Sequence, residues 1–453
     1  MADKHLYDHT NGVENCLVVH PYLKSTYRVA PAVAARLGEA EGLAQAISLN
    51  VAGCEAISLS KLRPATLMGQ GAVERITDLI TAFKGDGDDH GEHQEIYISV
   101  VIVDAALTPI QQRNLETAWK TKVIDRTGLI LEIFGERAQT KEGRLQVELA
   151  AQSYQRSRLV RSWTHLERQR GGAGFMGGPG ETQIETDRRL IDQRITRLKK
   201  DLNEVKRTRK LHRDSRKRIP YPIVALVGYT NAGKSTLFNR LTAADVAARD
   251  QLFATLDPTM RRLDLPSGRT VILSDTVGFV SDLPHELVSA FNATLEEVIE
   301  ADVIVHVRDI ASSNTESQKA DVLGVLKGLG LDDDRVSGMV EVLNKIDLLE
   351  PEEQEVAENR SERNAEVIPL SAVTGEGCEY FLDKINDRLM EKFQILETTL
   401  SISDGKMQAW LYDHGEVLER EDDEANVRLK VRLDTANISR FEQITSTSAS
   451  DNS

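Results

Sequence analysis

Short apolar runs alternate with longer amphipathic stretches through the first third of the chain. Runs with the length of buried strands lie at residues 16–19, 52–59, 96–104 and 129–134, and stretches with helical spacing lie at 32–47, 72–83 and 109–120. Strands that alternate with helices in this way are typical of a parallel or mostly parallel sheet. We therefore expect an N-terminal α/β domain over residues 1–140.

Two long helical segments follow this region. Residues 142–161 have the length and spacing of a helix, and a stretch rich in glycine then covers residues 171–180. No ordinary helix or strand tolerates that composition. In residues 186–218 apolar residues recur at helical spacing, and neither Gly nor Pro interrupts them before Pro220. This pattern predicts a long helical arm or hairpin over residues 141–219, with the glycine-rich loop between its helices.

The pattern changes again after Pro220. Apolar strands separated by helical segments predict a P-loop nucleotide-binding α/β domain with a mostly parallel sheet over residues 220–399. Residues 407–431 alternate as short strands, which favours a small α+β or all-β C-terminal domain over residues 400–453. The small and polar residues after Ile444 predict a disordered tail.

Composition narrows the class of protein. Of the 453 residues, 40% are hydrophobic and 28% charged, which excludes a fibrous or wholly disordered chain. Three widely spaced cysteines form neither a disulfide framework nor a paired zinc-binding motif. The apolar runs are too short to span a membrane, and the start of the chain lacks the pattern of a signal peptide. We expect a cytoplasmic monomer without a membrane span, and leave peripheral membrane association open.

Charge is unevenly distributed along the chain. The formal net charge of −15 argues against general nucleic-acid binding, yet residues 188–218 contain far more Lys and Arg than Asp and Glu. A solvated helix face is the ordinary explanation of such a run. Its position beside a glycine-rich loop favours contact with RNA instead.

A phosphate-binding loop stands directly after the apolar strand at residues 223–227. It has the GxxxxGK[ST] pattern and leads into a helical segment, as such loops require. Its backbone N–H groups are expected to surround a β-phosphate at a helix N-terminus. Lys234 should reach the β- and γ-phosphates, and the Ser235 hydroxyl should bind Mg²⁺. The residues expected to contact the nucleotide here are Gly228, Tyr229, Thr230, Asn231, Ala232, Gly233, Lys234 and Ser235.

A second motif follows the apolar strand at residues 271–273. It is a DxxG sequence whose carboxylate can hold Mg²⁺ through water and whose glycine N–H can contact the γ-phosphate. Its residues, all expected at the nucleotide, are Asp275, Thr276, Val277 and Gly278. Many GTPases place a water-orienting glutamine directly after this glycine, but here the position holds Phe279, which cannot hydrogen-bond to water. We therefore expect slow intrinsic hydrolysis, unless a nearby side chain replaces the glutamine.

Two further motifs indicate which base is bound. The sequence Asn344, Lys345, Ile346, Asp347 ends an apolar strand, and Ser371, Ala372, Val373 follows another. The Asp347 carboxylate can accept hydrogen bonds from guanine N1 and the 2-amino group, whereas adenine would leave it unpaired. Asn344 can bond to N7, Lys345 can lie across the ring, and the Ala372 N–H can bind O6. Four motifs in this order predict a site for GTP and GDP.

Between the first two motifs, one threonine should complete Mg²⁺ coordination when the γ-phosphate is present. Spacing alone does not decide between Thr255 and Thr259.

The motifs together resemble the HflX family of ribosome-associated GTPases. The resemblance rests on the glycine-rich residues 177–189, the long basic helix, the phosphate loop and residues 253–257, and it extends to residues 123–134 and 145–150. It covers most of the chain. It favours Thr255 as the Mg²⁺ ligand alongside Ser235, with Lys234, Thr255 and Gly278 as the catalytic groups. The nucleotide contacts that it adds are Phe253, Ala254, Thr255, Leu256 and Asp257.

The resemblance also implies a function. It implies binding to the large ribosomal subunit and its RNA, hydrolysis of GTP with Mg²⁺, and subunit splitting or ribosome rescue. The alternatives are another ribosome-assembly or RNA-binding GTPase, a P-loop phosphotransferase acting on a small metabolite, or an RNA-binding module with a structural nucleotide. Two departures stand out: the acidic loop at residues 85–93 resembles an insertion, and Arg308 stands where an apolar strand residue is expected.

Overall fold

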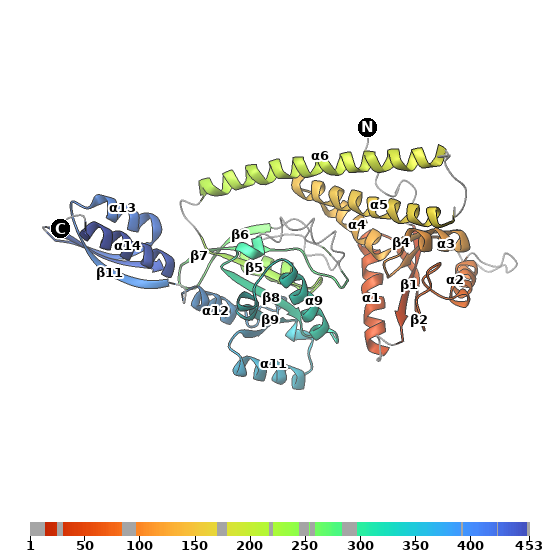
Figure 1. Cartoon of the computed structure of the whole chain (residues 1–453). Coiled ribbons are helices and arrows are strands. Elements are labelled where there is room, and N and C mark those ends of the chain that lie inside the picture. Colours follow the sequence, from red (N-terminus) through yellow and green to blue (C-terminus); the bar gives the residue numbers. More distant parts are fainter. Residues whose placement is uncertain are drawn as a thin grey trace.

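The described residues form three sheets, of four, six and three strands. The computed structural model describes residues 14–24, 30–83, 97–169, 179–216, 221–243, 253, 259–282, 297–390, 393–423 and 425–450. The three sheets follow one another along the molecule, and a long helix runs above the first two (Figure 1). The expected α/β fold class is confirmed.

The N-terminal sheet is parallel throughout, with the strand order β2-β1-β3-β4. Cys16 and Val18 on β1 face a cluster that includes residues of α1 and α4, whereas Leu17 and Val19 face α2 and α3. A sheet buried on both faces explains the continuous apolar runs in the sequence. The elements are β1 (Asn15–Leu23), α1 (Ala30–Ala46), β2 (Asn50–Leu59), α2 (Gln70–Phe83), β3 (Ile98–Val103), α3 (Pro109–Trp119), β4 (Lys122–Asp125) and α4 (Arg126–Arg137).

One expected strand of this domain is wrong. Residues 129–134 lie in helix α4, and the fourth strand, β4, comes just before them. The Asp125 side chain caps the helix by accepting a hydrogen bond from the Gly128 N–H at 2.9 Å. Every residue from Arg126 to Phe134 is buried, so the helix lacks the polar face by which a helical pattern is recognised.

The arm consists of α5 (Lys141–Gln169) and α6 (Pro179–Arg216), which lie side by side (Figure 1). Ile195, Leu198 and Leu202 of α6 are buried at the expected helical spacing. Arg194 pairs with Glu148 of α5, so one of the basic side chains is neutralised within the arm. Residues 171–178 of the glycine-rich loop expected at 171–180 lie outside the described residues, as does the acidic loop at 85–93. Pro179 and Gly180 belong to α6, so this helix begins before residue 186, where the sequence pattern places its start.

The six-stranded sheet has the order β10-β9-β8-β5-β7-β6. All neighbouring pairs are parallel except β6 with β7, which puts one antiparallel strand at the edge. Its elements are β5 (Ile223–Gly228), α7 (Lys234–Thr242), β6 (Thr259–Asp264), β7 (Thr270–Asp275), β8 (Val303–Asp309), α9 (Thr315–Gly328), α10 (Asp333–Ser337), β9 (Val340–Asn344), the 3₁₀ helix η1 (Ile346–Leu348), α11 (Pro351–Arg363), β10 (Val367–Leu370) and α12 (Cys378–Met390).

The last sheet is antiparallel, with the order β11-β13-β12. Its first strand begins at Phe393, before the domain boundary expected at residue 400, and Met407 lies in a helix rather than a strand. The prediction of a disordered tail after Ile444 is also wrong, because α14 continues to Ser450. The elements are β11 (Phe393–Ser401), α13 (Gly405–His414), β12 (Glu416–Asp422), β13 (Asn426–Asp434) and α14 (Thr435–Ser450).

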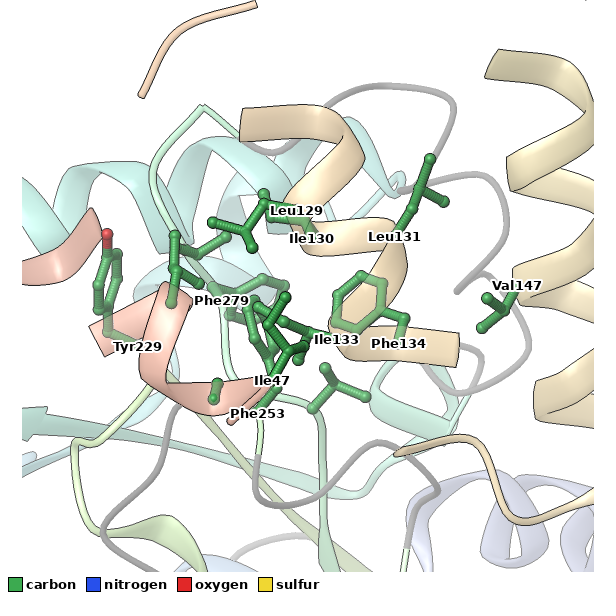
Figure 2. Close-up of a cluster of buried hydrophobic side chains, with 14 of the residues drawn as sticks. Ile47, Leu129, Ile130, Leu131, Ile133, Phe134, Val147, Tyr229, Phe253 and Phe279 are labelled. Atoms are coloured by element: carbon green, nitrogen blue, oxygen red, sulfur yellow. The ribbon is translucent and has the colours of Figure 1, made fainter. Parts of the chain in front are cut away.

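One apolar cluster joins the first two sheets. It contains Ile130 and Ile133 of α4 together with Tyr229 and Phe279 from the six-stranded domain (Figure 2). Phe253 packs edge-on against Phe134, with ring centroids 4.7 Å apart. The nucleotide motifs of the sequence therefore lie against the N-terminal domain.

Candidate functional site

The phosphate loop joins β5 to α7 and owes its shape to two glycines. Gly228 has φ +154° and Gly233 has φ +91°, so both adopt backbone conformations that other residues rarely reach. A Cβ at Gly228 would collide with the Val307 carbonyl, and one at Gly233 with the Asn344 side chain. Gly233 stands at the N-terminus of α7, where free backbone N–H groups favour an anion.

Lys234 is buried beneath this loop. Its Nζ donates hydrogen bonds to the carbonyl oxygens of Tyr229 at 2.8 Å and Gly228 at 3.2 Å. Burial lowers the pKa of Lys234 to about 8, and the negative charge of Asp275 only partly opposes that shift. The ammonium is thus buried at the base of the loop with carbonyl oxygens as its hydrogen-bond partners.

Ser235 and Asp275 meet beside the lysine. The Ser235 hydroxyl donates to Asp275 Oδ2 at 2.6 Å, and Asp275 is completely buried at the end of β7. Thr276 is buried too, and its hydroxyl donates to the Leu226 carbonyl at 2.7 Å, which ties the DxxG motif to β5. The structure therefore brings the first two motifs together as the sequence predicts.

The end of the DxxG motif lies directly on the phosphate loop. A Cβ at Gly278 would stand 2.8 Å from Thr230 Cγ2 and 3.1 Å from Lys234 Nζ, so only glycine allows this approach. Phe279 forms a bridge to the loop, because its N–H donates to the Gly228 carbonyl at 3.1 Å and its carbonyl accepts from the Thr230 N–H at 2.7 Å. The Phe279 side chain is buried in the apolar cluster with Val277.

The base-reading motifs meet at the same edge of the sheet. Asn344 donates through Nδ2 to the Ala232 carbonyl at 2.8 Å and accepts from the Ala372 N–H at 2.9 Å. That contact uses the N–H that was expected to bind guanine O6. Lys345 forms an ion pair with Asp309 at 2.8 Å, which holds its stem beside the loop.

The other residues of these motifs differ in exposure. Asp347 is exposed at the rim, whereas Ile346 is buried. Ser371 is buried, and its hydroxyl accepts from the Thr374 N–H at 3.1 Å. Val373 is 66% exposed.

The segment expected to complete the Mg²⁺ site is described only at Phe253 and at Thr259, which begins β6 and pairs with Asp275 of β7. Phe253 is buried and faces α4, away from the exposed surface. Ala254, Thr255, Leu256 and Asp257 lie outside the described residues.

A polar network that the sequence does not predict joins the two domains at the phosphate loop. The Tyr229 hydroxyl donates to Glu39 of α1 at 2.5 Å and accepts from the Ser281 N–H at 2.7 Å. Arg126 pairs with Glu39 and Asp104 and donates to the Ser281 carbonyl at 3.0 Å. Because these residues are far apart in sequence, no local motif signals the network.

Arg308 also has a structural explanation. It is buried at the end of β8, where it pairs with Glu341 of β9 and with Glu316 of α9, the latter at 2.7 Å. A paired guanidinium can take the place of the apolar residue that the strand pattern predicts.

Known proteins are similar to this chain over most of its length. Family models match residues 34–135 (GTP-binding GTPase N-terminal), 137–216 (GTP-binding GTPase Middle Region), 223–345 (50S ribosome-binding GTPase) and 356–450 (HflX C-terminal domain). The chain is 49% identical over 409 residues to GTPase HflX of Magnetococcus marinus, a match that covers 90% of each protein. The chain belongs to the HflX family of GTPases. It is 40% identical over 436 residues to GTPase HflX of Escherichia coli, covering 94% of this chain and 95% of that protein.

Membership of the HflX family identifies the chemistry of the site. The chain is a P-loop GTPase that hydrolyses GTP to GDP and phosphate. No helix in the described ranges has both the length and the apolar character needed to cross a membrane.

Proposed function

We propose that this HflX-family chain is a GTP-driven switch that binds the large ribosomal subunit and splits or rescues ribosomes. The main observation behind the proposal is that one chain combines a GTPase domain of this family with a basic helical arm, α5 and α6. The matching model for residues 223–345 is a 50S ribosome-binding GTPase. Arg197, Lys199 and Lys200 of α6 are exposed and form no ion pair with any described residue. Such cations suit the phosphate backbone of ribosomal RNA.

The contacts at the phosphate loop support specific roles toward the nucleotide. Lys234 holds the β- and γ-phosphates, and the Gly278 N–H contacts the γ-phosphate. Asp347 and Asn344 read the guanine, and the loop of Ser371, Ala372 and Val373 contacts its O6 side. The γ-phosphate would have to be accommodated where Gly278 now lies against Thr230 and Lys234, so binding of GTP is coupled to movement of the DxxG segment.

The residues around Ser235 fit a magnesium ion. The Ser235 hydroxyl and the Asp275 carboxylate are oxygen donors of the type that Mg²⁺ prefers, and they lie 2.6 Å apart. Ser235 would bind the ion directly and Asp275 through water, with Thr255 as a further ligand. When bound, the ion neutralises charge that develops on the phosphate oxygens.

Phe279 determines how hydrolysis is regulated in this proposal. Its side chain is buried between the domains and cannot position water, so intrinsic hydrolysis is slow. The ribosome then supplies or orders the missing group. In other GTPases a group supplied in trans is worth on the order of 10³ to 10⁵ in rate.

The test combines cosedimentation with phosphate release. Purified large subunits are mixed with the full chain and either GDP or a non-hydrolysable GTP analogue, and hydrolysis is measured with and without ribosomes. We expect tighter binding with the GTP analogue and a strong rise in turnover. No binding in either nucleotide state would overturn the proposal.

A charge-reversed variant localises the contact. The triple variant Arg197→Glu, Lys199→Glu, Lys200→Glu should bind ribosomes more weakly, with a shallower salt dependence and unchanged basal hydrolysis. The matched control is Arg360→Glu, Arg363→Glu on α11, two exposed basic residues on a different helix. Equal loss of basal and stimulated activity in the triple variant would mean that the arm stabilises the GTPase domain rather than binding RNA.

A further inference from the structure

Arg240, near the end of α7, donates hydrogen bonds to two backbone carbonyls of the loop that follows β10. Its Nε donates to the Ala372 carbonyl at 2.6 Å, and its Nη2 donates to the Val373 carbonyl. Gly375, with φ +94°, lets the loop turn around the guanidinium, since a Cβ there would lie 2.6 Å from Arg240 Nη1. The planar fork of arginine suits two neighbouring acceptors and fixes both of them.

The same loop is held from its other side by Asn344. Asn344 Oδ1 accepts a hydrogen bond from the Ala372 N–H, and Arg240 Nε donates one to the Ala372 carbonyl. Because a peptide unit is planar and trans, fixing the Ala372 carbonyl also fixes the Val373 N–H, which points the opposite way. Among the described residues, the Val373 N–H has no hydrogen-bond partner.

We infer that Arg240 is a positioning residue that orients the Val373 N–H toward the 6-position of the purine. This inference rests on the proposed guanine site. A fixed N–H donates a hydrogen bond to the O6 of guanine and repels a 6-amino group, which is itself a donor. Asp347 reads the N1–H and the 2-amino group, so the 6-oxygen is read by a different group. Since Arg240 lies on the helix that begins with Lys234, one helix supports both the phosphate site and the reader of the 6-position.

The test measures base selectivity rather than affinity alone. The full chain, Arg240→Ala and Arg240→Lys are titrated with GDP, with the hypoxanthine diphosphate that lacks the 2-amino group, and with the 2,6-diaminopurine diphosphate that carries a 6-amino group. For Arg240→Ala we expect the preference for GDP over the 6-amino analogue to fall about tenfold, whereas the preference for GDP over the hypoxanthine analogue stays unchanged. Lysine lacks the planar guanidinium that can bond to two carbonyls at once. The preference of Arg240→Lys for GDP over the 6-amino analogue should therefore lie between those of the parent and the alanine variant.

Arg335 provides a matched control in the same domain. Its guanidinium also forks onto two carbonyls, those of Ile299 and Ala301, away from the base-reading loop. Arg335→Ala should leave both selectivity ratios at the parent values. If Arg240→Ala leaves the 6-position ratio unchanged, or lowers both ratios equally, Arg240 is merely structural and the inference is wrong. If the parent chain itself does not discriminate between the three bases, the proposed guanine site fails instead.

Discussion

The four-stranded and the six-stranded sheet each have a buried cation at the carboxyl ends of their parallel strands, and the two cations are compensated differently. Lys234 in the GTPase domain bonds to the carbonyls of Gly228 and Tyr229, and no carboxylate of the described residues lies within ion-pair distance of it. Arg126 in the N-terminal domain pairs with Asp104 and Glu39. The pKa values follow this difference: burial lowers that of Lys234 to about 8, whereas the two carboxylates raise that of Arg126 despite its burial.

The comparison separates a ligand site from a structural joint. A buried cation with only neutral partners gains most from an incoming anion, whereas one already neutralised by carboxylates gains little. A cavity of about 560 Å³ lies beside Arg126, but its arginines are paired: Arg36 with Asp282, and Arg158 with Asp125. The size of a cavity alone therefore does not make it an anion site.

Lys234→Ala is the change with the largest expected effect. Removal of the cation takes away the main positive charge at the phosphates, so hydrolysis should fall by about 10³-fold or more. The rate of phosphate release under saturating GTP measures this fall in hydrolysis. Lys327→Ala is the control, since that lysine is exposed on α9 and pairs with Asp333. Turnover of Lys234→Ala at the parent rate would remove Lys234 from the site and break the comparison.

The same contrast between a ligand site and a structural joint exists for two carboxylates, Asp347 and Asp104. Unlike Asp104, which is bonded to His20 and Arg126, Asp347 is exposed and has no ion pair with the described residues. Asp347→Asn replaces an acceptor by a group that can donate, so the preference should move from guanine to xanthine by about 10² to 10³. Competition of GDP against xanthosine diphosphate measures the change. Unaltered preference for guanine would mean that the carboxylate does not touch the base.

Arg126→Met tests the structural joint. Loss of the guanidinium leaves Asp104 and Glu39 without their cation in a buried place, so the free energy of unfolding should fall by about 3 kcal/mol. Affinity for GDP should change far less. Urea denaturation and GDP titration give the two quantities.

Arg75→Met is the control for this variant, because Arg75 is 66% exposed in its pair with Glu55 and should contribute less than about 1 kcal/mol. A large loss of GDP affinity in Arg126→Met without loss of stability would assign Arg126 to a ligand and reverse the comparison.

The sequence predicts the nucleotide motifs because each is a short run whose chemistry depends on neighbours in the chain. The strand before the phosphate loop and the glycines within it are visible in this way. Arg126 is different, since its partner Glu39 lies 87 residues away, and Arg240 reaches a carbonyl 132 residues further along. Only the folded chain brings such groups together.

Burial explains the main error in the predicted elements. Residues 126–134 of helix α4 are all buried, because the helix lies between the N-terminal sheet and residues such as Phe253 and Phe279 of the next domain. Phe279 stands directly after the DxxG glycine, and its buried side chain cannot hydrogen-bond to water. Its role in joining the domains depends on contacts with α4 that no local pattern carries.

The smallest expected effect concerns the pH dependence of GDP binding. Phosphate favours the charged ammonium, so binding raises the pKa of Lys234 from its value of about 8 in the nucleotide-free chain. Below that pH the lysine is charged in both states and affinity stays constant, whereas above it binding requires uptake of a proton. Affinity should therefore fall about fourfold between about pH 7 and 8.5, a range in which guanine N1 keeps its proton. Calorimetry in buffers of different ionisation enthalpy counts the protons taken up. Lys122→Gln is the control, because burial also lowers the pKa of that lysine but it lies in the N-terminal sheet. If proton uptake does not rise with pH in the parent chain, Lys234 is not the uncompensated cation that the comparison requires.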